Sequence, residues 1–141
     1  MFWVFSKGSK CRRVTKRSLS TSESGLRLVN ARTGRVLADS VEIARGLVRR
    51  FVGAIGRHAL DGALGLSSCD WVHTFLVRFP LDIVYCDRDG SALRVLAGIA
   101  PNRLAPRVPG AYWAWEMRAG HLAPYVSPGD RLIITTQASE A

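Results

Sequence analysis

Four polar side chains stand within or beside apolar segments of the sequence, where side chains of these types can bind a ligand or transfer a proton. They are His73, Arg78, Asp82 and Glu116. In an extended strand His73 faces the same side as the apolar residues Trp71, Phe75 and Val77, because side chains alternate with a period of two. A buried imidazole needs a hydrogen-bond partner or a ligand. We favour a core histidine bonded to the backbone or to Asp82, and keep as the alternative a pocket histidine that acts as a general base or ligand.

The two carboxylates of this set each allow two interpretations. Asp82 lies in an otherwise apolar run, where a carboxylate needs a partner that Arg78 or His73 could supply. We favour a structural role for Asp82 over a chemical one. Glu116 is expected either to line a pocket or to form a surface ion pair with Arg118. The sequence therefore predicts a small concave site near His73, Asp82 and Glu116, with Arg78 as a further candidate.

Other combinations of reactive residues fit no established motif. Asp87 and Asp89 precede Gly90 in a tight-turn sequence, without the spacing of an EF-hand calcium loop. Cys69 precedes His73 by four residues, about 13 Å along a strand, which is too far for a Cys-His nucleophile. No Cys-x-x-Cys pair, phosphate loop or nucleophile elbow occurs. We therefore expect no bound metal and no cofactor.

The composition indicates one globular domain with an unequal charge distribution. The chain has 141 residues, 48% of them hydrophobic and 22% charged, and no apolar run approaches the roughly 18 residues of a transmembrane helix. Residues 1–24 contain six Lys or Arg and one Glu, hence +5 of the net charge of +9, which leaves +4 for residues 25–141. We predict a basic disordered tail over 1–24, a domain over 25–136 and a loose end over 137–141. Three cysteines without a pairing pattern favour a cytoplasmic location.

Hydrophobic periodicity predicts the elements that must position these residues. Thr33-Gly34 joins two short apolar segments in an opening hairpin. Apolar residues then recur at helical spacing from Ala44 to Ile55, with Asp39 as the cap of the first turn and Glu42 completing a capping box. A Gly-rich loop and later a Pro-rich irregular loop over 100–110 separate the remaining segments. The predicted strands cover residues 26–29, 36–38, 71–77, 81–86, 93–99, 112–117 and 131–136.

This pattern of short strands with one early amphipathic helix defines the expected fold class. It predicts a mainly β (α+β) domain, built as a compact small β-barrel or a jelly-roll-like sandwich.

One block of the sequence resembles a known family. Residues 73–90 read HTFLVRFPLDIVYCDRDG, and the segments NARTG, GR, WEMRAG and GDRL fall before and after it in the expected order. Together they are similar to the bacterial and archaeal domain of unknown function 192, over roughly residues 26–135. The resemblance implies a small β-rich barrel or jelly-roll-like fold and no established activity. Related proteins usually carry Gly-Met or Trp-Met where this chain has Leu76-Val77, so a site that uses this methionine would be altered here.

Three functional hypotheses follow. The first is a non-enzymatic accessory domain that binds a small ligand or a protein partner at the predicted concave site. The second is a hydrolase- or lyase-like enzyme that uses His73 with a carboxylate. The third is nucleic-acid or anionic-surface binding driven by the basic tail, to which arginines of the predicted helix would contribute.

Overall fold

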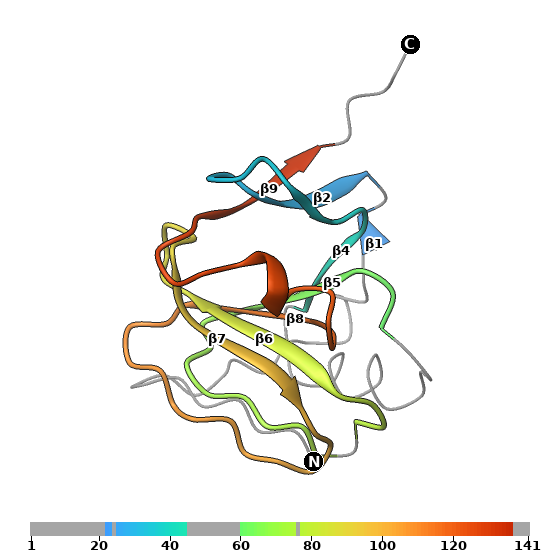
Figure 1. The fold of residues 1–141 in the computed structure, drawn as a ribbon, viewed down its shortest axis with the longest axis vertical. Helices are drawn as coiled ribbons and strands as arrows, with labels where there is room; N and C mark the ends of the chain where they lie inside the picture. Colours follow the sequence, from blue (N-terminus) through green and yellow to red (C-terminus); the bar gives the residue numbers. More distant parts are fainter. Residues whose placement is uncertain (1–21, 24, 45–59, 76, 137–141) are drawn as a thin grey trace, which may run out of the picture.

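The computed structural model describes residues 22–23, 25–44, 60–75 and 77–136. Within these ranges the chain forms nine strands and one short 3-10 helix (Figure 1). They are β1 (Ser22–Glu23), β2 (Leu26–Asn30), β3 (Val36–Ala38), β4 (Val41–Ala44), β5 (Ala63–Ser67), β6 (Leu81–Cys86), β7 (Ala92–Ile99), β8 (Trp113–Arg118), η1 (Ala123–Tyr125) and β9 (Leu132–Thr136).

The strands belong to two sheets. The larger sheet has six strands in the order β1-β4-β5-β8-β6-β7, and the smaller has three in the order β3-β2-β9. Figure 1 shows the smaller sheet at one end of the molecule, beyond η1. Within the described residues the two sheets do not join into a closed ring of strands. The mainly β class is therefore confirmed, whereas the predicted barrel is wrong: β1 and β7 are the two edges of the larger sheet and do not pair with each other.

Both faces of the larger sheet are covered at β6, which explains why five of the six residues of this strand are apolar. All six residues of β6 are buried, and their side chains alternate between two hydrophobic clusters. Leu81, Ile83 and Tyr85 enter the loop-side core, where loop residues such as Val72 and Ala105 cover the sheet. The alternate residues face the sheet-side core, which the smaller sheet and the segment around η1 cover.

The start of the predicted helix is wrong. Val41–Ala44 forms β4, which runs parallel to β5 with Val41 opposite Ala63, so Asp39 and Glu42 do not cap a helix there. The β-branched Val41 and Ile43 suit a strand, and pairing with β5 outweighs the helical spacing. Residues 45–59 of the predicted helix lie outside the described residues.

Two further differences concern the segments around the predicted site. The predicted Gly-rich loop contains β5, in which Gly65 leaves room for the Trp115 ring: a Cβ at Gly65 would lie 2.5 Å from that ring. The predicted strand over 71–77 is wrong, because residues 71–75 and 77 make only an isolated bridge, between His73 and Leu104, among the described residues. Residues 72, 73 and 74 are all buried, which differs from the exposed face that a half-buried strand would have.

The other predicted elements are confirmed. The opening hairpin is β2–β3, and the strands predicted over 81–86, 93–99, 112–117 and 131–136 correspond to β6, β7, β8 and β9. The segment 87–90 is a turn, and residues 100–110 contain no regular strand. Residues 1–21 and 24 of the predicted tail, and 137–141 of the predicted loose end, lie outside the described residues, while Ser22–Glu23 forms β1. No helix among the described residues has the length and apolar character needed to cross a membrane.

Candidate functional site

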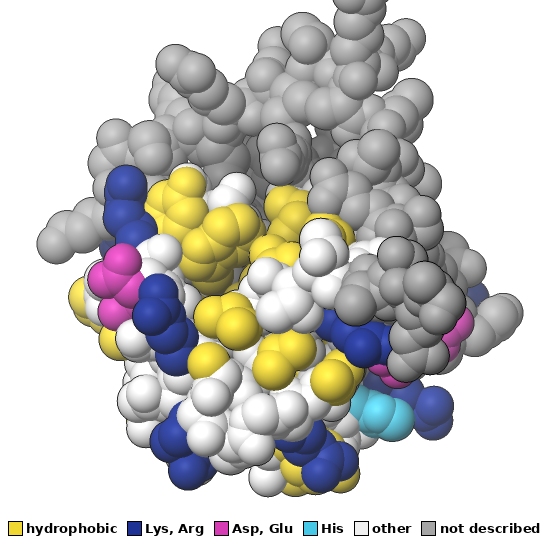
Figure 2. Space-filling view, turned by 90° about the horizontal axis from the view of Figure 1, so that it is seen from above, with side chains coloured by type: hydrophobic (Ala, Val, Ile, Leu, Met, Phe, Trp, Pro, Cys, Tyr) yellow, Lys and Arg dark blue, Asp and Glu magenta, His cyan; other side chains and the backbone are white. Residues whose placement is uncertain are grey.

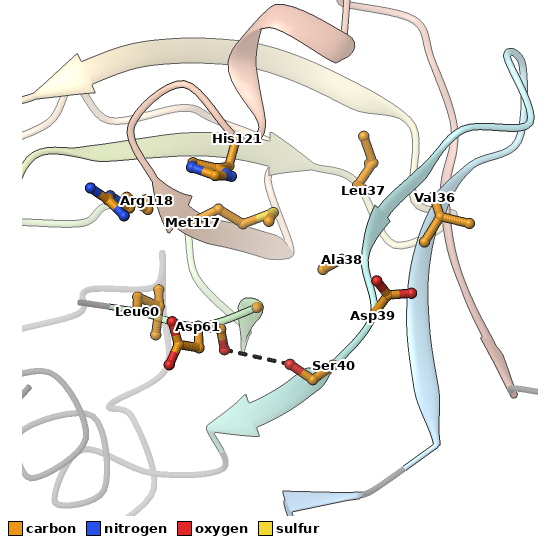
Figure 3. Close-up of a pocket in the computed structure, with 11 residues that line it drawn as sticks. Val36, Leu37, Ala38, Asp39, Ser40, Leu60, Asp61, Met117, Arg118 and His121 are labelled. Carbon is orange, nitrogen blue, oxygen red and sulfur yellow. Dashed lines mark hydrogen bonds between the residues drawn. The ribbon is translucent and has the colours of Figure 1, made fainter.

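A pocket of about 310 Å³ opens at the end of the larger sheet where β4 and β5 begin and β8 ends (Figure 3). Three chain segments that are distant in sequence form its walls. These segments contribute Val36, Leu37, Ala38, Asp39 and Ser40; Leu60, Asp61 and Gly62; and Met117, Arg118 and His121.

Close approach of two backbones shapes one side of the pocket. The Ala63 amide donates to the Ser40 carbonyl at 3.0 Å, and the Ser40 hydroxyl donates to the Asp61 carbonyl at 3.5 Å. Gly62 lies between these contacts with a positive φ of 90°. A Cβ at Gly62 would lie 2.6 Å from the Ser40 carbonyl oxygen, so glycine is required both for the conformation and for the space.

The pocket combines an apolar base with opposite charges at its rim. Met117 and Leu37 are buried and contribute apolar surface. Arg118 and His121 are exposed and lie together in Figure 3, with Asp61 across the pocket from His121. Such a site presents cationic and anionic groups to one small molecule.

The loop that carries His121 is held in place by Asp82. The Asp82 side chain is buried, with 1% of its surface exposed, on the sheet-side face of β6. Its Oδ2 accepts hydrogen bonds from the amides of Gly120 (3.0 Å), Leu122 (3.2 Å) and Ala123 (2.8 Å). Its Oδ1 accepts one from the Gly98 amide at 2.9 Å. Asp82 therefore positions the pocket loop, residues 120–123, through backbone amides, whereas the sequence suggested Arg78 or His73 as its partner.

Glu116 lies on the other face of the same sheet. Its partners across the strands are Leu64 and Ile83, both in the loop-side core, whereas Asp82 pairs with Met117 of the sheet-side core. Side chains of directly opposed residues share a face. Asp82 and Glu116 are therefore separated by the sheet, and Glu116 is buried.

His73 and Arg78 lie in the loops that cover the loop-side core. His73 is buried, bridges to Leu104 through its backbone, and places its ring 4.9 Å from the Phe75 ring. Arg78 is exposed. The four predicted site residues thus do not surround one common cavity, although a catalytic or binding role for His73 stays a prediction.

Another buried carboxylate, Asp130, joins the turn before β9 to β2. It accepts hydrogen bonds from the Arg32 guanidinium, the Ser127 amide (2.9 Å) and the Asn30 side chain (2.9 Å). These donors, the Arg32 side chain foremost, lower the pKa of Asp130 well below its ordinary value. This network fixes β2 against the turn before β9 in the smaller sheet, and its residues do not line the pocket.

The two cysteines that the structure describes show no reactive arrangement. Cys69 and Cys86 are buried free thiols, and Cys11 lies outside the described residues. Burial, assisted by the negative charge of Asp87, raises the pKa of Cys86 to about 12. In the described part of the chain, no three His, Cys, Asp or Glu side chains gather in a group that could hold a metal ion.

Sequence reasoning missed most of the pocket residues. Ser40, Asp61 and His121 lie in turns and loops of ordinary polar composition, 21 and 60 residues apart along the chain. The signal that could have pointed to them was Gly62, because a glycine before an apolar segment often marks close backbone approach.

The fold and the pocket define a two-sheet β domain with a small site of mixed polarity at one end of the larger sheet. The sequence profile of a family described as uncharacterized ACR, the domain of unknown function 192 (DUF192), matches residues 28–134. The chain belongs to this family, and the resemblance noted from the sequence is confirmed.

Two solved structures share the fold. A protein from Sinorhizobium meliloti 1021, described as a "putative transcription regulator", is 24% identical, with a TM-score of 0.63 over 77% of this chain and 90% of that chain. A protein of unknown function from Novosphingobium aromaticivorans is 19% identical, with a TM-score of 0.63 over 77% of this chain and 83% of that one. At these identities the likeness concerns the fold alone. No curated protein matches the chain.

Proposed function

We propose that this domain is a non-enzymatic binding module whose pocket takes a small zwitterionic molecule of the amino-acid type. The observation that carries the proposal is the pocket itself, in which Arg118 and His121 lie on one side and Asp61 on another, over an apolar base. A carboxylate would pair with the Arg118 guanidinium, and an ammonium group with Asp61.

The size and the contacts of the pocket support a small ligand and a binding role. A volume of about 310 Å³ is at the lower end of ligand pockets, which span roughly 300–1,000 Å³. The Ser40 hydroxyl, the potential nucleophile of the pocket, donates to a backbone carbonyl. A nucleophile needs a base as the acceptor of its proton, so this arrangement favours binding over catalysis.

Thermal unfolding with a ligand panel tests the proposal. The panel contains zwitterionic amino acids, matched carboxylic acids and matched amines, each assayed with the full chain. A ligand at 100 times its Kd stabilises the folded state by about 2.7 kcal/mol, which raises the Tm by several degrees in a domain of this size. We expect zwitterions to raise the Tm more than either single-charge analogue.

Two variants and a control connect binding to the pocket. Arg118→Gln and Asp61→Asn should each weaken zwitterion binding at least tenfold, since each removes one charged partner. The control is Arg131→Gln, an exposed arginine on the other side of the molecule. If no zwitterion raises the Tm, or if all three variants bind equally well, the proposed function is wrong.

A further inference from the structure

A second surface, separate from the pocket, is formed by two loop segments that cover the loop-side core. Residues 70–75 and 102–108 run side by side, joined by the bridge between His73 and Leu104. Backbone hydrogen bonds of 2.8–2.9 Å connect Thr74 to Asn102 and Arg103, and Val72 to Ala105. We name this pair of segments, together with Arg78 just beyond them, the loop ribbon.

The core beneath the loop ribbon fixes its geometry. The Thr74 side chain is fully buried, and its hydroxyl donates to the Ala100 carbonyl at 2.6 Å and accepts from the Arg103 amide at 3.0 Å. The Tyr85 hydroxyl accepts from the Val72 amide at 3.1 Å. These contacts make the ribbon a defined platform, although it is not a regular strand pair.

The exposed side of the loop ribbon carries positive charge without exposed acidic groups. Arg78, Arg103 and Arg107 are exposed there. The acidic residue of the ribbon is Asp70, which is buried and accepts from Arg107 at 3.1 Å. Among the described residues, no ion pair involves Arg78 or Arg103. Both guanidinium groups are therefore available to an anionic partner.

Apolar and aromatic groups lie among these arginines. Leu104 is 60% exposed, and Phe75 is 36% exposed with its ring held against the buried His73 ring. Trp71 is half-buried and oriented by a 2.7 Å hydrogen bond from its indole nitrogen to the Ala105 carbonyl. An arginine-rich surface with a fixed, exposed aromatic ring matches the combination that binds single-stranded nucleic acid, in which arginines contact phosphates and rings stack on bases.

We infer that the loop ribbon binds single-stranded nucleic acid, with Arg78 and Arg103 at the phosphates and a base stacked on Phe75. A second copy of the chain is a poor occupant, because a two-fold contact would oppose arginine with arginine. An acidic peptide would satisfy the arginines but would stack on Phe75 only if it carried an aromatic side chain, whereas every nucleotide carries a base. The inference does not depend on the pocket, which is lined by other residues.

Fluorescence anisotropy with a labelled 20-nucleotide oligo(dT) tests this inference on the full chain at several salt concentrations. The double variant Arg78→Gln/Arg103→Gln removes two phosphate contacts. It should therefore reduce the magnitude of the slope of log K, the association constant, against log salt concentration by about 1.4. Phe75→Ala should weaken binding about 5- to 150-fold by removing one stacked base. Thermal unfolding of each variant confirms that the protein is folded.

The matched control is Arg35→Gln/Arg131→Gln, which makes the same change of charge beside the smaller sheet. This control should leave the salt slope within about 0.3 of wild type. Equal losses in the two double variants would show that overall charge drives binding and would overturn the inference. The inference would also be wrong if the wild type did not bind the oligonucleotide at 50 mM salt, or if Phe75→Ala bound it with unchanged affinity. Binding of anionic lipid vesicles as tight as binding of the oligonucleotide would likewise overturn it.

Discussion

Replacement of Asp82 should destabilise the protein more than replacement of any exposed carboxylate. Its two oxygens accept four backbone amides, from Gly98 on β7 and from Gly120, Leu122 and Ala123 in the pocket loop, at 2.8–3.2 Å. Asp82→Ala leaves all four donors without this acceptor. An unsatisfied donor costs about 1 kcal/mol or more, so we expect a loss of about 4 kcal/mol from a total of roughly 5–15 kcal/mol.

Asp82→Asn separates the loss of charge from the loss of an acceptor. The amide oxygen can still serve the three amides of the pocket loop, but the NH₂ group then faces the Gly98 amide, donor against donor. One hydrogen bond and the charge assistance at the others are lost, so we expect about 2 kcal/mol. The wild type should be the most stable protein, followed by Asp82→Asn and then by Asp82→Ala.

Urea unfolding followed by circular dichroism at pH 7 measures these differences. The control is Asp39→Asn, because Asp39 is 80% exposed and its 3.3 Å pair with Arg27 is solvated. That variant should differ from wild type by less than about 1 kcal/mol. If Asp82→Ala costs no more than Asp39→Asn, the four hydrogen bonds do not hold the pocket loop and our reasoning is wrong.

Three further predictions concern buried groups elsewhere. Because the Arg32 contact lowers the pKa of Asp130, the contribution of the ionised Asp130 to stability is complete above the ordinary carboxyl pKa of 3.8 and declines as the pH falls further. Asp130→Asn should therefore be less stable than wild type at pH 7, and urea unfolding should show a smaller difference between the two proteins at pH 3. A difference that is the same at both pH values would contradict this prediction. The Cys86 thiol, whose pKa is raised to about 12, should resist alkylation by iodoacetamide at pH 8 in the folded protein and should react in urea. Peptide mass spectrometry measures the labelling, and rapid labelling of the folded protein would disprove the burial of Cys86. Gly65→Ala should cost about 1–3 kcal/mol in urea unfolding because the new methyl group overlaps the Trp115 ring, and an unchanged midpoint would mean that the ring moves aside freely.

Figure 2, which looks onto the molecule from the end that carries the smaller sheet, shows apolar side chains between scattered arginines. Val29, Ile133 and Val36 are direct neighbours across the three strands of that sheet, and Val36 is 41% exposed.

Much of the strand content could be predicted because local patterns determine it. The Asp-Arg-Asp-Gly turn and the apolar run of β6 required only turn chemistry and burial, and both are confirmed. The family resemblance arose from segments that include this turn and β6, and it is confirmed as well. Asp82 was identified as a buried carboxylate that needs partners, since a charge inside an apolar run is costly without them.

Tertiary contacts decided the remaining features. Val41–Ala44, where the sequence predicts the first turn of a helix, forms a strand because it pairs in parallel with β5. The partners of Asp82 are backbone amides, which every sequence contains, so no residue type could indicate them. Asp82 and Glu116 are on opposite faces because of the register of β6 against β8.

The sequence by itself therefore determined the mainly β class, the principal strands and the presence of a buried carboxylate, because burial and turn chemistry depend on neighbouring residues. The tertiary structure decided where the pocket lies and which side chains line it, because Ser40, Asp61 and His121 meet only when β4, β5 and β8 align. It also assembled the loop ribbon, whose two segments are joined by hydrogen bonds between residues about 30 positions apart.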